Sequence, residues 1–191
     1  MADFQKAFQR TMGNEGGYVN DPADKGGETY RGISRRFFPS WPGWENIDSL
    51  KKQPGGFPGN APLAPGLSLQ VSEFYKVNFW DRILGDAIAV QEVAEELFDD
   101  AVNMGIDPAV KFLQEAICLL NRNGAIQADL AIDGKLGLGT LSAMGKILTE
   151  NNGLRHLLLC INGLQLEYYF NICRRNPSQE KFLRGWIERT V

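Results

Sequence analysis

The chain has 191 residues, of which 43% are hydrophobic and 23% charged, and its net charge is −3. This composition is typical of a globular protein and excludes disorder as the global state. The length suits one hydrophobic core, alone or with a closely packed extension. The small negative charge argues against nucleic acid as the main partner.

Cysteine and histidine usage indicates no redox or triad chemistry. Cys118, Cys160 and Cys173 lie in apolar segments without CxxC spacing, so we expect buried, reduced thiols. His156 is the only histidine and adjoins a run of leucines, which indicates a helix residue and not a member of a Ser-His-Asp triad. Residues 1–10 contain no apolar signal segment, and no run is long enough to span a membrane. We therefore expect synthesis in the cytoplasm without a classical signal peptide.

The first 38 residues predict a helix followed by a small, irregular β-hairpin. Apolar residues recur at helical spacing over residues 3–14, and the glycines that follow place Glu15 at or just past the end of this helix. Turn-forming residues between short β-prone pieces predict the hairpin within residues 18–38.

A Pro- and Gly-rich segment over residues 39–66 predicts a long surface loop with one helical turn near residues 48–53. A functional loop and a disordered flap are both open interpretations.

The remainder is predicted to be helical. Apolar periodicity and capping signals predict six helices, at residues 68–83, 88–104, 107–121, 140–150, 154–174 and from 177 onward. A loop is expected at residues 124–139. The aromatic residues assigned to the core are Phe74, Phe98, Phe112 and Trp186.

Glu15, Asp24 and Thr29 form the constellation that carries chemistry. Hydrolysis of a glycosidic bond needs an acid that keeps its proton near neutral pH, and a water molecule on the opposite face of the sugar. Glu15 is followed by two glycines that would let a substrate approach the backbone, while Asp24 and Thr29 could hold the water. In the structural alternative, Glu15 ends a helix and Asp24 forms a turn.

The run EGGYVNDPADKGGETYRGIS at residues 15–34 resembles the signature of glycoside hydrolase family 108. The resemblance extends to further elements along the chain, at residues 79–81, at residue 99 with 102–105, at residues 112–114, at residues 133–137 with 140, and at residues 177–186. This family comprises muramidase-type lysozymes, which occur as phage endolysins or in prophage-like secretion loci.

The resemblance implies a mainly α, lysozyme-like α+β fold. It would have an N-terminal catalytic helix, a small β-hairpin lobe and then a helical bundle. Residues 1–104 would form the catalytic region and residues 105–191 a peptidoglycan-binding-like region, packed together as one compact unit.

By the same resemblance, Glu15 is the general acid, and Asp24 and Thr29 position the water. The Glu–Asp–Thr order is also similar to that of phage-type lysozymes, which invert the anomeric carbon, although the Asp-to-Thr spacing is one residue shorter here. Sugar binding uses aromatic faces and amide groups. The candidates are Tyr18, Asn20, Tyr30, Trp80 and Asn103. For Tyr30 and Trp80 a place in the core is the open alternative.

No metal or cofactor is expected. Residues 129–134 loosely resemble a calcium loop, but Ala131 and Thr140 stand where an oxygen ligand and a glutamate are needed.

Three functions remain open. The sequence favours an N-acetylmuramidase acting on peptidoglycan glycan strands in the periplasm or cell wall, after export or release by another factor. A lytic transglycosylase would instead yield 1,6-anhydro products. The third function is a non-catalytic peptidoglycan-binding or secretion-helper protein.

Overall fold

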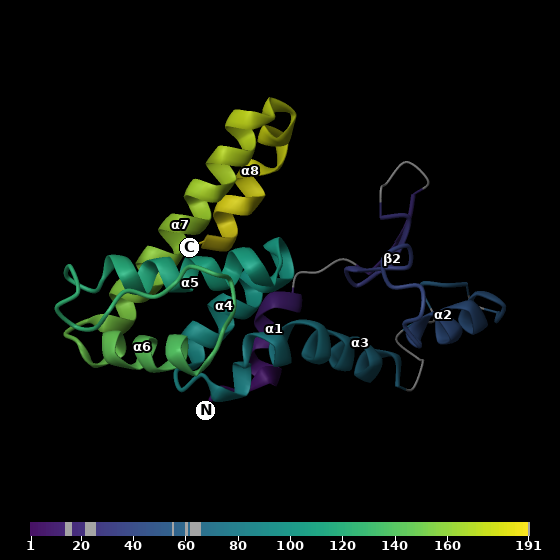
Figure 1. The fold of residues 1–191 in the computed structure, drawn as a ribbon. Coiled ribbons are helices and arrows are strands. Elements are labelled where there is room, and N and C mark those ends of the chain that lie inside the picture. The colour runs from purple at the N-terminus through teal and green to yellow at the C-terminus, as the bar shows by residue number, and fades with distance from the viewer. Residues whose placement is uncertain (14–16, 22–25, 55, 60, 62–65, 191) are drawn as a thin grey trace. The chain divides into compact units, whose positions relative to one another are not determined.

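Helices dominate the computed structural model, which describes residues 1–13, 17–21, 26–54, 56–59, 61 and 66–190 (Figure 1). Within these residues there are eight α-helices and one three-stranded antiparallel sheet, which confirms the mainly α class with a small β-lobe. The helices are Phe4–Met12 (α1), Gly43–Lys51 (α2), Leu67–Tyr75 (α3), Gln91–Met104 (α4), Ile106–Leu119 (α5), Leu138–Thr149 (α6), Gly153–Arg175 (α7) and Glu180–Ile187 (α8). The strands are Tyr18–Asn20 (β1), Glu28–Tyr30 (β2) and Ile33–Ser34 (β3).

The chain divides into two compact units. The N-terminal unit comprises residues 4–81, and the C-terminal unit comprises residues 1–3 and 82–191. The expected boundary between residues 104 and 105 lies within the C-terminal unit, where α4 and α5 pack against each other. As a boundary between a catalytic and a binding region, it stays a prediction.

Helix α1 lies within the range expected from its apolar spacing. Phe4 and Ala7 are buried, and the Phe4 ring lies 5.5 Å from that of Phe8 and 5.6 Å from that of Trp80. The Phe8 ring in turn lies 5.8 Å from that of Tyr75 in α3. Aromatic contacts therefore join α1 to the segment at the end of α3.

The predicted hairpin contains a third strand. β2 pairs with β1 on one side and with β3 on the other, both antiparallel. Arg31 and Gly32 connect β2 to β3, with φ angles of +44° and +77°. Two consecutive positive φ angles suit the twist of a two-residue hairpin turn, and glycine takes such a conformation without strain.

Helix α2 is longer and begins earlier than the single turn expected near residues 48–53. Its residues Trp44, Ile47 and Leu50 follow helical spacing and are all buried. The neighbouring prolines and glycines concealed this short apolar stripe. Helix α3 also ends earlier than expected, because residues 76–80 continue as a π-helical turn in which Asn78 donates a hydrogen bond to the Phe74 carbonyl.

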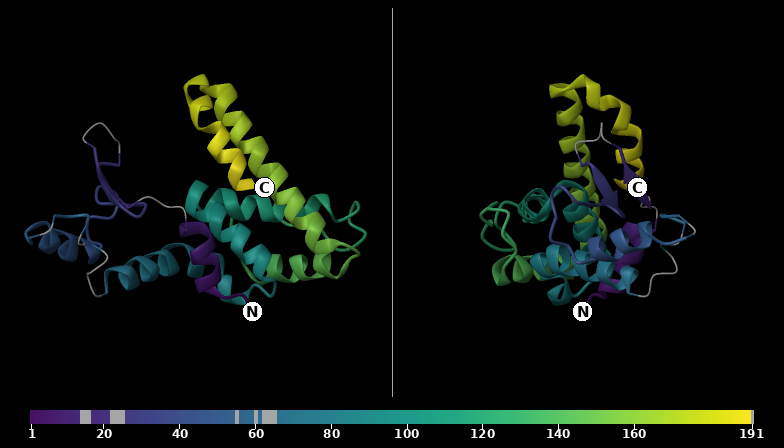
Figure 2. Two further views of the ribbon diagram at one scale, coloured as in Figure 1. Left: turned by 180° about the vertical axis from the view of Figure 1, so that it is seen from behind. Right: turned by 90° about the vertical axis from the view of Figure 1, so that its right-hand side faces the viewer.

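The helices of the C-terminal unit follow the predicted positions within a few residues. α7 and α8 lie side by side in all views (Figures 1 and 2). Trp186 on α8, expected in the core, is only half-buried. Among the cysteines Cys173 is buried, whereas Cys118 and Cys160 are half-buried, and all three are free thiols.

Two buried amides hold the predicted loop at residues 124–139. Gln114 donates to the Asp133 carboxylate and accepts from the Gly134 backbone, and Asn121 donates to the Gln127 carbonyl and the Asp129 carboxylate. These bonds give Asp129 and Asp133 structural partners. None of the helices in the described ranges has a stretch long and hydrophobic enough to cross a bilayer.

Candidate active site

The sheet of the N-terminal unit carries three of the expected sugar-binding residues on one face. Paired residues of neighbouring strands share a face, and successive residues of one strand alternate between faces. Tyr18 pairs with Tyr30, and Asn20 pairs with Glu28. These three residues therefore share a face with Glu28, a carboxylate that was not among the expected site residues.

Thr29 lies on the opposite face. It pairs with Val19 and Ser34, and its hydroxyl donates a hydrogen bond to the Gly27 carbonyl at 3.2 Å. The Ser34 hydroxyl likewise donates to the Gly26 carbonyl at 2.6 Å. Because the hydroxyl proton of Thr29 is committed to Gly27, its oxygen remains as an acceptor. In this state Thr29 can receive a hydrogen bond from a water molecule.

Glu28 anchors the sheet to α2 through a charged network. Its carboxylate accepts hydrogen bonds from Lys51, from Arg35 at 3.1 Å and from the Tyr18 hydroxyl at 3.2 Å. Arg35 also donates two bonds, of 2.7 and 2.6 Å, to the Asp48 carboxylate. Sequence reasoning missed the network because its charged groups come from three separate segments.

The protonation state of Glu28 argues against a role as general acid. Burial raises the pKa of Glu28, but the hydrogen bonds and charges of Lys51 and Arg35 outweigh it, so the pKa lies below the usual value. A glycosidase acid needs a pKa raised toward neutrality. Glu28 is therefore an ionised structural group.

The aromatic rings of the hairpin pack inward. Tyr30 is 7% exposed, and its ring stacks on that of Trp41 at 6.4 Å and contacts that of Phe57 at 6.1 Å. This supports the core alternative for Tyr30. Tyr18 is half-buried, with its ring 4.5 Å from that of Phe57, whereas Asn20 is exposed. Asn20 is thus the better placed of the three for contact with a ligand.

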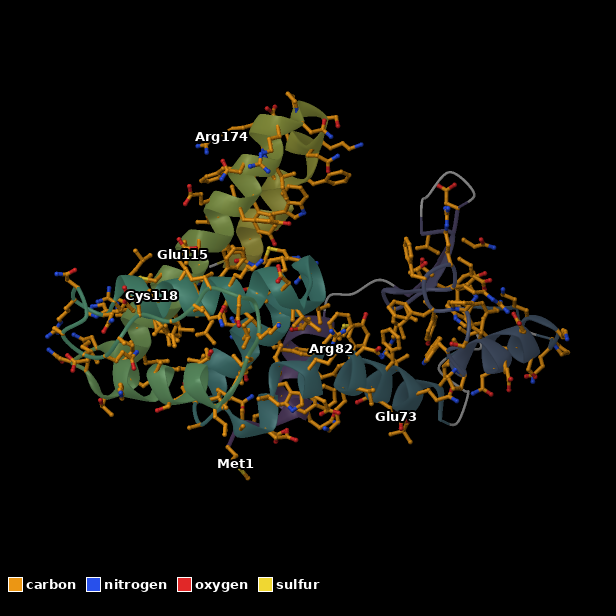
Figure 3. The ribbon with its side chains drawn as sticks, in the orientation of Figure 1. Met1, Glu73, Arg82, Glu115, Cys118 and Arg174 are labelled. Carbon is orange, nitrogen blue, oxygen red and sulfur yellow. The ribbon has the colours of Figure 1, made fainter. Side chains whose placement is uncertain are left out.

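A pocket of about 360 Å³ opens beside this aromatic packing, within the N-terminal unit. Its lining combines aromatic, amide and carboxylate side chains and comprises Phe38, Ser40, Trp41, Pro42, Gln70, Glu73, Phe74, Val77 and Asn78. Figure 3 labels Glu73, which projects from α3. Aromatic walls with a few polar groups are typical of ligand pockets. Phe74 was expected only in the core. For the lining residues between positions 38 and 42, the available signal in the sequence was the cluster of aromatic residues and prolines at residues 37–44.

The remaining expected residues lie elsewhere. Trp80 is completely buried against Phe4, so the core alternative accounts for it. Asn103 belongs to the C-terminal unit and lies in the last turn of α4. Glu15 and Asp24 lie outside the described residues, so their roles stay predictions. In the ranges that are described, no group of three or more His, Cys, Asp or Glu side chains could hold a metal ion.

Two family models match this chain, one after the other along the sequence. Residues 8–105 match the family model described as glycosyl hydrolase 108, and residues 108–191 match the one described as a predicted peptidoglycan domain. No curated protein matches the chain. The solved structure of Brucella abortus SagA is similar in fold, with a TM-score of 0.62 and 22% sequence identity, over 98% of this chain and 88% of that chain.

Proposed function

Since the chain belongs to the glycosyl hydrolase 108 family and is a glycoside hydrolase, we propose that it is an N-acetylmuramidase acting on peptidoglycan. It would hydrolyse the β-1,4 bond between N-acetylmuramic acid and N-acetylglucosamine. Its place of action would be the peptidoglycan layer, outside the cytoplasm.

One observation carries the proposal: the two family matches adjoin on one chain. The glycosyl hydrolase match ends at residue 105, and the match to the predicted peptidoglycan domain begins at residue 108. A hydrolase for sugar–sugar bonds joined to a region of this kind has peptidoglycan strands as its natural substrate.

In the proposed mechanism, Glu15 protonates the leaving glycosidic oxygen. The attacking water donates one hydrogen bond to the carboxylate of Asp24 and one to the hydroxyl oxygen of Thr29. Because Thr29 gives its own proton to Gly27, its oxygen is suited to accept this bond. With both protons engaged, the lone pairs of the water face the anomeric carbon, and Asp24 takes a proton as the new bond forms.

The products of digestion test the reaction type. Purified peptidoglycan sacculi are incubated with the protein, and the soluble fragments are analysed by mass spectrometry. Hydrolysis adds water and gives reducing N-acetylmuramic acid ends, which is the expected result. Fragments that are 18 Da lighter, with 1,6-anhydro ends, would identify a lytic transglycosylase. Binding to sacculi with no soluble product would identify a non-catalytic binding protein.

A further inference from the structure

A second pocket, of about 270 Å³, lies within the C-terminal unit. Residues from the end of α4, from α7 and from the C-terminal helices line it, namely Asn103, Met104, Tyr168, Tyr169, Ile172, Trp186 and Arg189. Its volume lies just below the roughly 300–1,000 Å³ typical of sites for drug-sized ligands, which suits one sugar ring. The lining comes from both family matches, because Asn103 and Met104 precede residue 105.

A series of side-chain hydrogen bonds holds the guanidinium group of Arg189 at this pocket. The Asn103 side-chain nitrogen donates to the backbone carbonyl and the carboxylate of Asp99, each at 2.8 Å. The Asn103 side-chain oxygen accepts a bond of 2.7 Å from Nη1 of Arg189. Since the side-chain nitrogen of Asn103 donates both of its protons to Asp99, the side-chain oxygen of Asn103 faces Arg189. Asn103, expected to bind sugar directly, therefore serves as a positioning residue for the guanidinium.

Aromatic side chains form the other wall. The Trp186 ring stacks on that of Tyr169, with centroids 4.9 Å apart and an interplanar angle of 20°. Tyr168 adjoins Tyr169 at 6.2 Å. Trp186 and Tyr168 are half-buried, so each presents part of its ring at the surface. Such rings offer a rigid apolar surface to the C–H groups of a sugar, while the guanidinium offers fixed donors to a carboxylate.

We propose that this pocket binds one acidic muramyl unit of a peptidoglycan strand. The N-acetylated ring contacts the aromatic wall, and a carboxylate on its lactyl group or on the attached peptide pairs with Arg189. The ligand class rests on the proposed function, whereas the location of the site rests on the pocket itself.

The test measures binding in a Glu15→Gln background, in which the substrate is not consumed. The probes are three soluble compounds: the GlcNAc–MurNAc disaccharide with a free lactyl carboxylate, muramyl dipeptide with a peptide carboxylate, and N,N′-diacetylchitobiose (below, chitobiose), which is N-acetylated and has no carboxylate. NMR titration of the tryptophan indole signals follows binding, and the Trp186 signal is the one missing in Trp186→Leu. We expect this signal to shift, with tighter binding of at least one acidic probe than of chitobiose, and the tighter acidic probe identifies the carboxylate source.

Single substitutions separate the contribution of the aromatic wall to binding from that of Arg189. Trp186→Leu lacks the reporter indole, so its binding is measured by isothermal titration calorimetry. It should bind all probes about tenfold more weakly. Arg189→Gln and Asn103→Ala should weaken only the acidic probes, about tenfold, and remove their advantage over chitobiose. Loss of that preference, with chitobiose binding retained, is a readout that a purely structural role of Asn103 would not move.

A matched control lies on α8, outside the pocket lining. Arg184→Gln changes an exposed cation of this helix and should bind like the parent. An equal loss in this control, or unchanged binding in Arg189→Gln and Asn103→Ala, would overturn the proposal. Those two variants alter exposed side chains, so they decide the matter even where Trp186→Leu fails to fold. A catalytically active Glu15→Gln protein would refute the proposed mechanism without changing this result.

Discussion

Gln165 on α7 donates a hydrogen bond to Oδ1 of Asp100 on α4, and both side chains are buried almost completely. Among the described residues, Oδ2 of Asp100 and Oε1 of Gln165 have no hydrogen-bond partner. Burial raises the pKa of Asp100 well above its usual range, and the charges of Glu96 and Asp99 raise it further, against a smaller opposing effect of Gln165. A proton on Asp100 removes the buried charge and turns one unpartnered acceptor oxygen into a donor, in line with the raised pKa.

Asp100→Asn should stabilise the C-terminal unit at pH 8. A folded pKa above the unfolded one means that Asp100 contributes full stability below the unfolded pKa, and that this contribution is lost as pH rises toward the folded pKa. Asparagine keeps the shape and supplies a donor at every pH. Relief of an unsatisfied buried group is worth about 1–3 kcal/mol. Urea unfolding followed by far-UV circular dichroism at pH 5 and pH 8 measures the difference.

The gain of Asp100→Asn should shrink at pH 5, where more of the wild-type Asp100 holds its proton. An equal loss of stability at both pH values would contradict a protonated Asp100. Glu96 and Asp99 are present in both the wild type and Asp100→Asn, so the difference between the two proteins reports on Asp100 itself.

Glu28→Gln should destabilise the N-terminal unit by about 1–2 kcal/mol at pH 7, since it removes charged hydrogen bonds with Lys51 and Arg35. The lowered pKa of Glu28 gives stability that is present above the unfolded pKa and is lost as pH falls through the folded pKa. The variant should therefore lose part of the acid sensitivity of the wild type below about pH 4.5.

Tryptophan fluorescence during urea unfolding measures the effect of Glu28→Gln, because three of the four tryptophans lie in this unit. Glu45→Gln, at an exposed carboxylate of α2, is the control and should leave stability within about 0.5 kcal/mol of the wild type. Equal effects of the two variants would show that the network contributes nothing specific.

Thr29→Val should lower the rate of sacculus clearing at least about tenfold, since it removes the oxygen that accepts a hydrogen bond from the attacking water. Ser34→Ala is the matched control, because it removes a similar hydroxyl-to-glycine bond from the same face of the sheet. It should stay within about twofold of the wild-type rate. If both variants lose activity equally, Thr29 acts only by anchoring the glycine turn.

Long periodic helices were predictable from the sequence because their signal is local. The stripe at Val93, Ala94, Leu97, Phe98 and Ala101 repeats over several turns and is completely buried, as expected. Helix α2 carries the same kind of stripe over only nine residues, between prolines and glycines, and its extent was missed. Side-chain alternation could have placed Thr29 on the other face of the sheet from Tyr30, because successive residues of a strand point to opposite faces. Tyr18 pairs with Tyr30 and so shares the face of Tyr30.

Other features depend on contacts between distant segments. Asn103 was chosen as an amide near a family motif, but its bond to Arg189 joins residues 86 positions apart. Trp186 fits the apolar side of a helix equally well as a core residue or as a pocket wall. The structure distinguishes the two, because Trp186 is only half-buried and lines the pocket.

The central claim is that Glu15 supplies the proton for cleavage of peptidoglycan strands. The most direct measurement compares the clearing of purified sacculi by the wild type, Glu15→Gln and the control Glu45→Gln, with folding of each checked by circular dichroism. The account predicts that Glu15→Gln keeps its fold and clears sacculi at least about a hundredfold more slowly, while Glu45→Gln matches the wild type. A folded Glu15→Gln protein that clears sacculi at the wild-type rate would contradict it.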